Sequence, residues 1–222
     1  MVIFDCNGVL VDSEPLATAI VSQEFVRAGF PLTQDLIARY FTGRRPADMF
    51  AEVEFATGRK LPVGFAATVA AAILRRFRGE LRPTNHAAYA LSWLRGPKCV
   101  ASSSSLERIR VSLESTGLIR FFEPNLFSAS DVRKGKPAPD LFLHAAGKLC
   151  VEPGACIVVE DSPVGVAAGV AAGMMVICRC KPHRQPDRRS TARRRCPRDY
   201  LRPARPQKHD HRSARLVEPA QL

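Results

Sequence analysis

The sequence has no long hydrophobic run: no segment approaches the ~18 consecutive apolar residues that a membrane-spanning helix needs. It also lacks a basic lead before the apolar residues that begin at Met1, so a signal peptide is not expected. Its seven cysteines are odd in number and scattered, which argues against a disulfide scaffold. Cys178-Arg179-Cys180 has no second pair of thiols to indicate a zinc site. These absences favour a reducing cytoplasm as the location.

Acidic residues are scarce, but only at one end of the chain. The net charge of +12 over 222 residues divides into +2 for residues 1–177 and +10 for residues 178–222. The first 177 residues are therefore nearly neutral and, with 46% hydrophobic residues in the whole chain, can form an ordinary buried core.

The hydrophobic pattern predicts two regions of different architecture before the basic segment. Residues 15–82 contain helical patterns and no strand, with helices expected at 15–28, 33–41, 46–56 and 63–77. Afterwards strands and helices alternate: Thr84 is expected to cap a helix to Leu94, and strands are expected at 98–101, 126–127, 156–159 and 174–177. Alternating strand–helix units predict a doubly wound parallel α/β sheet, with residues 1–14 and 83–177 as one domain and an inserted all-helical domain at 15–82.

Polar residues follow the predicted strands where a parallel sheet places its site. The apolar run Val2 to Phe4 delivers Asp5 to a strand end, and Gly8 then turns the chain, as in the presentation of a nucleophilic carboxylate. Ser102 directly follows the next strand, where a hydroxyl backed by helix amides can hold a phosphate oxygen. Ser105 is expected to cap the helix that follows.

Two further stretches carry charge. Lys136 stands directly before Pro137-Ala138-Pro139-Asp140, and a fixed cation suits a phosphoryl group in transfer. Glu160 and Asp161 leave an apolar strand together, which is costly unless a cation compensates them, and Mg²⁺ prefers oxygen ligands. The alternative is a pair of exposed acids at a turn.

Taken in order, these four stretches resemble the motifs of the haloacid dehalogenase (HAD) superfamily. The similarity covers about residues 1–177 and is greatest to the helical-cap group that contains β-phosphoglucomutase-like proteins and sugar-phosphate phosphatases. It implies a Rossmann-like core, a nucleophile at Asp5, phosphate contacts from Ser102 and Ser103, and charge neutralisation by Lys136. It also implies Mg²⁺ bound by Asp5, the backbone carbonyl of Asn7 and Asp161, with Glu160 acting through water.

The chain departs from the family pattern at Asn7, where the family has its acid–base aspartate. An amide does not exchange a proton at neutral pH, so activity is expected to fall by about 10²–10⁴-fold while metal and phosphate binding survive. Three explanations of Asn7 are compatible with the sequence: a naturally weakened enzyme, a deliberate substitution that traps a complex, and a sequence variant of no functional purpose. In the insert, the resemblance places Gly43, Arg44 and Arg45 about where family members recognise substrate. The two arginines are expected either to bind an anionic or polyhydroxylated substrate or to be ordinary solvated charges.

Residues 178–222 do not continue the pattern, because arginine and proline replace apolar periodicity. A disordered arm that binds nucleic acid is one interpretation, but only Tyr200 could stack on bases; a coding frame that slipped near residue 178 is preferred. The chain as a whole is expected to be a monomeric or homodimeric phosphatase of a small phosphorylated metabolite, with no membrane partner. A phosphoglucomutase, a silent phosphate-binding protein and a nucleic-acid-binding protein are the alternatives.

Overall fold

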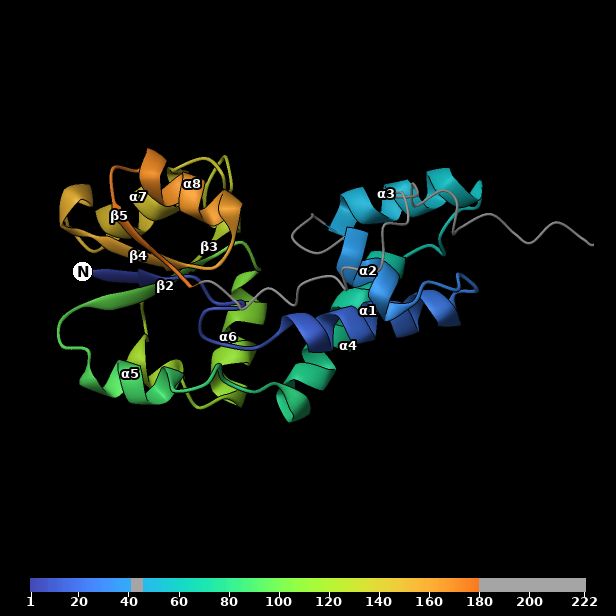
Figure 1. The fold of residues 1–222 in the computed structure, drawn as a ribbon, viewed down its shortest axis with the longest axis horizontal. Helices are drawn as coiled ribbons and strands as arrows, with labels where there is room; N and C mark the ends of the chain where they lie inside the picture. Colours follow the sequence, from blue (N-terminus) through green and yellow to red (C-terminus); the bar gives the residue numbers. More distant parts are fainter. Residues whose placement is uncertain (41–45, 180–222) are drawn as a thin grey trace, which may run out of the picture.

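A parallel sheet of five strands lies at the centre of one half of the described structure, beside a separate group of helices (Figure 1). The structure is a computed structural model that describes residues 1–40 and 46–179. The strands lie in the order β3-β2-β1-β4-β5, and every neighbouring pair is parallel. They comprise β1 (Val2–Phe4), β2 (Lys98–Ser102), β3 (Leu126–Ser128), β4 (Ile157–Glu160) and β5 (Met175–Cys178). The predicted doubly wound α/β fold is therefore confirmed.

Helices cover both faces of this sheet. Figure 1 shows α7 and α8 on one side of it and α5 and α6 on the other. Short 3₁₀ turns lie at Ile119–Phe121, Ala129–Asp131 and Pro153–Ala155. The covering helices are α5 (Ala87–Trp93), α6 (Leu106–Ser115), α7 (Asp140–Lys148) and α8 (Pro163–Ala171).

The alternation of side chains along each strand supplies one apolar face to each helical layer. Ile3, Ala101 and Val158 are fully buried among the side chains of α7 and α8. Val100 and Leu126 point to the opposite face and join the cluster that includes α6. Because both faces are covered, the strands are short continuous apolar runs, as expected for a buried parallel sheet.

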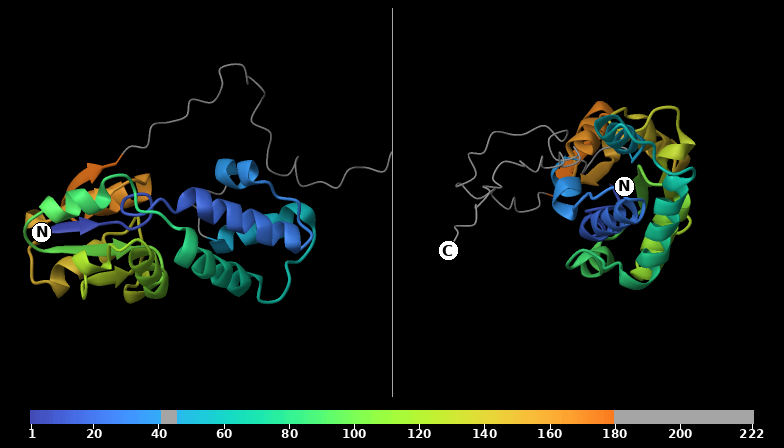
Figure 2. Two further views of the ribbon diagram at one scale, coloured as in Figure 1. Left: turned by 90° about the horizontal axis from the view of Figure 1, so that it is seen from below. Right: turned by 90° about the vertical axis from the view of Figure 1, so that its right-hand side faces the viewer.

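The remaining four helices form the inserted region. They are α1 (Glu14–Arg27), α2 (Gln34–Tyr40), α3 (Pro46–Thr57) and α4 (Phe65–Glu80). Figure 1 and Figure 2 show them grouped beside the sheet, on the side toward which β1 runs from the N-terminus. The carboxyl ends of the strands therefore face this insert.

None of the described helices is long and apolar enough to cross a membrane.

Aromatic rings hold the centre of the insert together. The ring of Phe25 on α1 is fully buried, and its centroid lies 4.9 Å from Phe65, 5.9 Å from Phe50 and 6.3 Å from Phe30. Edge-to-face pairs of this kind add to the stability that burial alone provides. The insert thus has an apolar centre of its own, which is continuous with the α6 side of the sheet.

The helix boundaries differ from the predicted ones in two informative places. The fourth helix begins at Phe65 rather than 63, since Gly64 has a left-handed backbone with a φ of 77°, and it continues to Glu80. The prediction that Thr84 caps the next helix is wrong, because His86 occupies the cap position. The Thr84 hydroxyl instead donates to the carbonyl of Val9 at 2.7 Å, where the insert returns to the sheet.

Phe25→Ala is expected to lower the free energy of unfolding by about 3–5 kcal/mol, because it removes a buried ring and leaves a cavity. Val26→Ala, on the same helix but 57% exposed, is expected to change it by less than ~0.5 kcal/mol. Urea denaturation of both variants measures the difference. Equal effects would mean that the aromatic cluster does not support the insert.

Candidate active site

The nucleophile candidate lies at the end of the central strand. Asp5 directly follows β1, is 7% exposed, and its backbone N–H donates to the carbonyl of Val159 at 2.9 Å. The chain then turns at Gly8, which has a φ of 77°. A Cβ atom there would lie 1.8 Å from the Asp161 carboxylate, so only glycine lets the two loops approach this closely.

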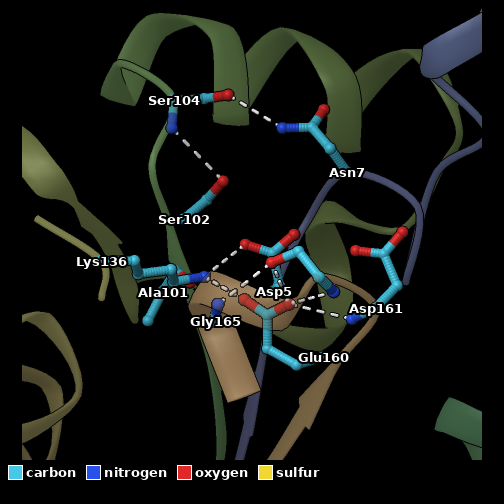
Figure 3. Close-up of polar contacts among 10 residues, drawn as sticks. Asp5, Asn7, Ala101, Ser102, Ser104, Lys136, Glu160, Asp161 and Gly165 are labelled. Atoms are coloured by element: carbon cyan, nitrogen blue, oxygen red, sulfur yellow. Dashed lines mark hydrogen bonds and ion pairs between the residues drawn. The ribbon is translucent and has the colours of Figure 1, made fainter. Parts of the chain in front are cut away.

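Lys136 connects three strand ends. Its ammonium donates to Asp5 Oδ1 at 2.7 Å, to Glu160 Oε1 at 2.6 Å and to the carbonyl of Ala101 at 3.2 Å (Figure 3). Only 3% of the Lys136 side chain is exposed, whereas Lys134, two residues earlier, is exposed. The lysine singled out from the sequence is therefore the one that reaches the carboxylates.

Glu160 is fully engaged in hydrogen bonds. It is 1% exposed, which excludes the alternative of two exposed acids at a turn. Its Oε2 accepts from the backbone N–H groups of Asp161 and Ser162, both at 2.9 Å, and from the Ser162 hydroxyl at 3.0 Å. A Cβ atom at Gly165 would lie 1.7 Å from Oε1, so α8 approaches the carboxylate closely. Glu160 thus orients Lys136, and its expected action on a metal through water stays a prediction.

Burial and neighbouring charges shift the pKa values of the groups in this cluster. Burial raises the pKa of Asp5 to about 6, against the opposing attraction of Lys136 and with further repulsion from Glu160 and Asp161. The pKa of Lys136 is also raised, because the Asp5 and Glu160 carboxylates outweigh the effect of its burial. The Asp5 and Glu160 carboxylates thus share the Lys136 ammonium, while Asp161 lies close enough to Asp5 to repel it.

The donor atoms present fit a hard divalent cation. No group of three or more His, Cys, Asp or Glu side chains in residues 1–40 and 46–179 could hold a metal by side chains alone. However, the Asp161 carboxylate lies against the backbone of Gly8, directly after Asn7. Asp5 uses only Oδ1 in hydrogen bonds within the described part of the chain. Two carboxylates and backbone oxygen are the ligands that Mg²⁺ takes alongside several waters.

Asn7 is held by two serines. Its Nδ2 donates to Ser104 Oγ at 2.9 Å, and its Oδ1 accepts from the Ser13 hydroxyl at 2.9 Å. Figure 3 shows the amide pointing toward Ser104 rather than toward Asp5. Ser13 ends the segment that enters α1, so Asn7 bridges the start of the insert and the loop before α6.

The serines at the end of β2 and in the loop that follows lie in different environments. Ser102 is 1% exposed at the strand end, and its Oγ accepts from the N–H of Ser104 at 3.4 Å. Ser103 is exposed, and its side chain makes no hydrogen bond within the residues that the structure describes. Ser105 caps α6, as predicted, by accepting from the N–H of Arg108.

The structure brings together the side chains of five of the predicted site residues. The Asn7 amide turns toward Ser104 instead (Figure 3), and Ser103 is exposed. Gly43, Arg44 and Arg45 lie outside the described residues. Three partners were missed: Ser13, Ser104 and Arg179, whose Nη1 donates to the carbonyl of Gly8 at 2.7 Å. Ser13 and Ser104 have no sequence signal beyond their nearness to the motifs, and Arg179 stands in a segment judged foreign to the fold. The five that lie together are Asp5, Ser102, Lys136, Glu160 and Asp161.

The raised pKa of Asp5 predicts a dependence of stability on pH. The Asp5 carboxyl ionises at a higher pH in the folded protein than in the unfolded chain, so its stabilising effect is complete below about pH 4 and is lost as pH rises through about 6. Without metal, wild-type stability relative to Asp5→Asn is expected to fall by about 2–3 kcal/mol over this window. Urea denaturation in a chelator from pH 4 to 7 measures it, with the exposed Asp12→Asn as control. Parallel wild-type and Asp5→Asn profiles would contradict the expectation.

Comparison with known proteins places this geometry in a family. A family model described as haloacid dehalogenase-like hydrolase matches residues 1–173. The chain is 33% identical over 187 residues to 6-phosphogluconate phosphatase of Escherichia coli K12, covering 83% of this chain and 85% of that protein. It is 31% identical over 187 residues to hexitol phosphatase A of the same organism, with 79% and 80% covered.

Solved structures agree with the sequence relatives. A haloacid dehalogenase-like protein of unknown function from Agrobacterium tumefaciens C58 is 35% identical, with a TM-score of 0.71 over 80% of this chain and 81% of that one. A HAD family hydrolase from Deinococcus radiodurans R1, crystallised with phosphate and sodium, is 32% identical, with a TM-score of 0.65 and 79% and 78% covered. By sequence, by fold and by the arrangement of its strand ends, the chain belongs to the haloacid dehalogenase-like hydrolases.

Proposed function

We propose that this chain is a Mg²⁺-dependent phosphatase of a small phosphorylated metabolite, a sugar phosphate or a related polyol or sugar-acid phosphate. The observation that carries the proposal is the Lys136 ammonium between Asp5 and Glu160, at 2.7 and 2.6 Å, beside the buried Ser102. A nucleophile, a cation and a hydroxyl donor at one sheet edge suit phosphoryl transfer. The relatives named for phosphatase activity on phosphorylated sugar acids and hexitols support the substrate class.

The first step is attack by Asp5 on phosphorus. An Asp5 carboxylate oxygen forms a bond to phosphorus as the ester bond to the substrate oxygen breaks, which leaves an aspartyl phosphate. Lys136 holds Asp5 in position and offsets the negative charge that builds up on the phosphoryl oxygens. Asp5, Asp161 and the backbone carbonyl of Asn7 would hold Mg²⁺, which when bound supplies positive charge against the phosphoryl oxygens and the nucleophile.

Asn7 limits both proton transfers. The departing oxygen needs a proton, and the water that later attacks the aspartyl phosphate must lose one. An amide side chain does neither at neutral pH. In this chain the departing oxygen must therefore take its proton from water, and the attacking water must lose its proton without a positioned base. Turnover is accordingly slow, while the groups that contact phosphate are retained.

A phosphate-binding protein without turnover is the second candidate. It is favoured by one observation: Asn7 is held by Ser13 and Ser104 and not directed at Asp5. A mutase would need residues of the insert that return the intermediate to its other hydroxyl; the segment 43–45, which is predicted to recognise substrate, lies outside the described residues.

Asn7→Asp is expected to raise Mg²⁺-dependent phosphate release from sugar phosphates by roughly 10²–10⁴-fold, because it supplies a proton donor and acceptor. Release from an aryl phosphate is expected to gain less in its first step, since its leaving group needs no proton. A colorimetric phosphate assay over a substrate panel measures both, and an Asp5→Asn, Asn7→Asp double variant should be inactive. Retained phosphate binding with no turnover in the Asn7→Asp protein would favour the silent binding protein.

Lys136→Ala in the Asn7→Asp background is expected to lower kcat/KM by at least ~10²-fold, the usual cost of removing a fixed charge at a developing anion. Lys134→Ala, which removes an exposed lysine two residues away, should leave it unchanged. Circular dichroism would establish that the Lys136 variant is folded, because it leaves two carboxylates buried without their cation. Equal effects of the two substitutions would show that the Lys136 contacts have no catalytic role.

A further inference from the structure

The hydrogen bonds of Asn7 have a direction that an aspartate could not produce. The amide accepts from Ser13 through Oδ1 and donates to Ser104 through Nδ2. An ionised carboxylate only accepts hydrogen bonds. With aspartate at position 7, both serine hydroxyls would have to donate to it, and each would use its proton there.

With asparagine, the Ser104 hydroxyl receives a hydrogen bond and keeps its own proton available. Within residues 1–40 and 46–179, no oxygen accepts a hydrogen bond from Ser104 Oγ. Ser102 Oγ likewise accepts from the Ser104 N–H without donating to a described residue. Two hydroxyl protons on one loop thus have no acceptor among the described residues, and in Figure 3 Ser102 lies between Ser104 and the Lys136 ammonium.

The loop that carries Ser104 is fixed from both sides. The Ser104 N–H donates to Ser102, and the Ser104 carbonyl accepts from the hydroxyl of Ser128 at 2.8 Å. Ser128 is fully buried, and its N–H donates to Asp131 at 2.9 Å. These bonds hold the backbone of Ser104 in the loop that ends β2, next to Ser102.

We propose that the Ser104 hydroxyl donates a hydrogen bond to a phosphoryl oxygen of the bound phosphate or phosphate monoester, and that it does so because residue 7 is asparagine. The inference rests on the proposed function. It adds that asparagine at position 7, which slows proton transfer, also leaves the Ser104 hydroxyl able to donate a hydrogen bond to phosphate. This chain therefore binds phosphate more tightly than a form with aspartate at position 7.

A double-mutant cycle tests this inference by binding rather than by activity. Equilibrium dialysis with radiolabelled inorganic phosphate and Mg²⁺ is carried out on the chain, Ser104→Ala, Asn7→Asp and the double variant. Ser104→Ala is expected to weaken phosphate binding roughly tenfold when Asn7 is present and less than about twofold in the Asn7→Asp background, since a hydrogen bond to a charged acceptor is lost only in the first case. The cycle subtracts the repulsion that the new carboxylate itself exerts on phosphate.

Three further variants make the result specific. Ser104→Thr keeps a hydroxyl and should retain the phosphate affinity of the chain. Ser92→Ala, at an exposed serine of α5 with no assigned role in the site, should change nothing in either background. Ser102→Ala should weaken phosphate binding in both backgrounds, because the buried Ser102 does not contact residue 7.

Equal losses from Ser104→Ala in the two backgrounds, or no loss when Asn7 is present, would overturn the inference. If Ser102→Ala weakens binding while the cycle shows no coupling, only the inference fails and the proposed function stands. If none of the proteins binds phosphate, the proposed function fails with it.

Discussion

The buried ion cluster around Lys136 is the constraint on which the rest of the site depends. One ammonium, 3% exposed, contacts the carboxylates that follow β1 and end β4 and a carbonyl of β2, so it ties three adjacent strands together at their carboxyl ends. Removing charges from water is costly, and a buried pair survives only when its remaining polar atoms are satisfied. Glu160 meets this condition through three further hydrogen bonds, whereas Asp5 has only the one from Lys136 to its side chain within the described residues, and burial raises its pKa.

Close backbone approach is what allows so many carboxylates to gather. Gly8 and Gly165 lie where any side chain would overlap Asp161 or Glu160, with Cβ distances of 1.8 and 1.7 Å. These two positions therefore set the separation between the turn after β1 and the start of α8. The parallel sheet also brings these groups together, because β1 lies between β2 and β4 and the three strands end side by side. Charge is concentrated here by geometry, and a divalent cation is the partner whose chemistry fits it.

The fold and the centre of the site could be predicted from the sequence because both depend on the order of apolar and polar residues along the chain. Apolar strands with polar ends located Asp5, Ser102, Glu160 and Asp161, and the resemblance to the family, which has a lysine directly before its Pro-x-Pro element, distinguished Lys136 from Lys134. What the sequence could not predict depends on atoms rather than residue types. Ser13 and Ser104 are ordinary serines in loops until the amide of Asn7 lies between them. Thr84 is a residue type that commonly caps helices, but its hydroxyl donates to the carbonyl of Val9, 75 residues earlier in the chain.

The change in composition at residue 178 and the end of the sheet ladder do not coincide. β5 includes Cys178, and the N–H of Arg179 donates to the carbonyl of Glu160 at 2.6 Å, so the first arginine of the basic segment still pairs with β4. Its guanidinium also contacts Gly8, in the turn that presents Asp5. In the described sheet β5 is an edge strand, with Met175 65% and Ile177 52% exposed, and apolar edges of this kind are normally covered.

A nucleic-acid-binding arm and a displaced reading frame are the two interpretations of residues 178–222, and residues 180–222 lie outside the described residues. Both interpretations have to accommodate Arg179, because its backbone extends the sheet and its side chain supports the turn after β1. Any residue with a backbone N–H at position 179 could make the contact with Glu160, so that contact does not distinguish the two interpretations, whereas the contact with Gly8 depends on the arginine side chain. The displaced reading frame therefore stays a prediction, and the described structure adds that the first arginine of the basic segment contacts the turn that presents Asp5.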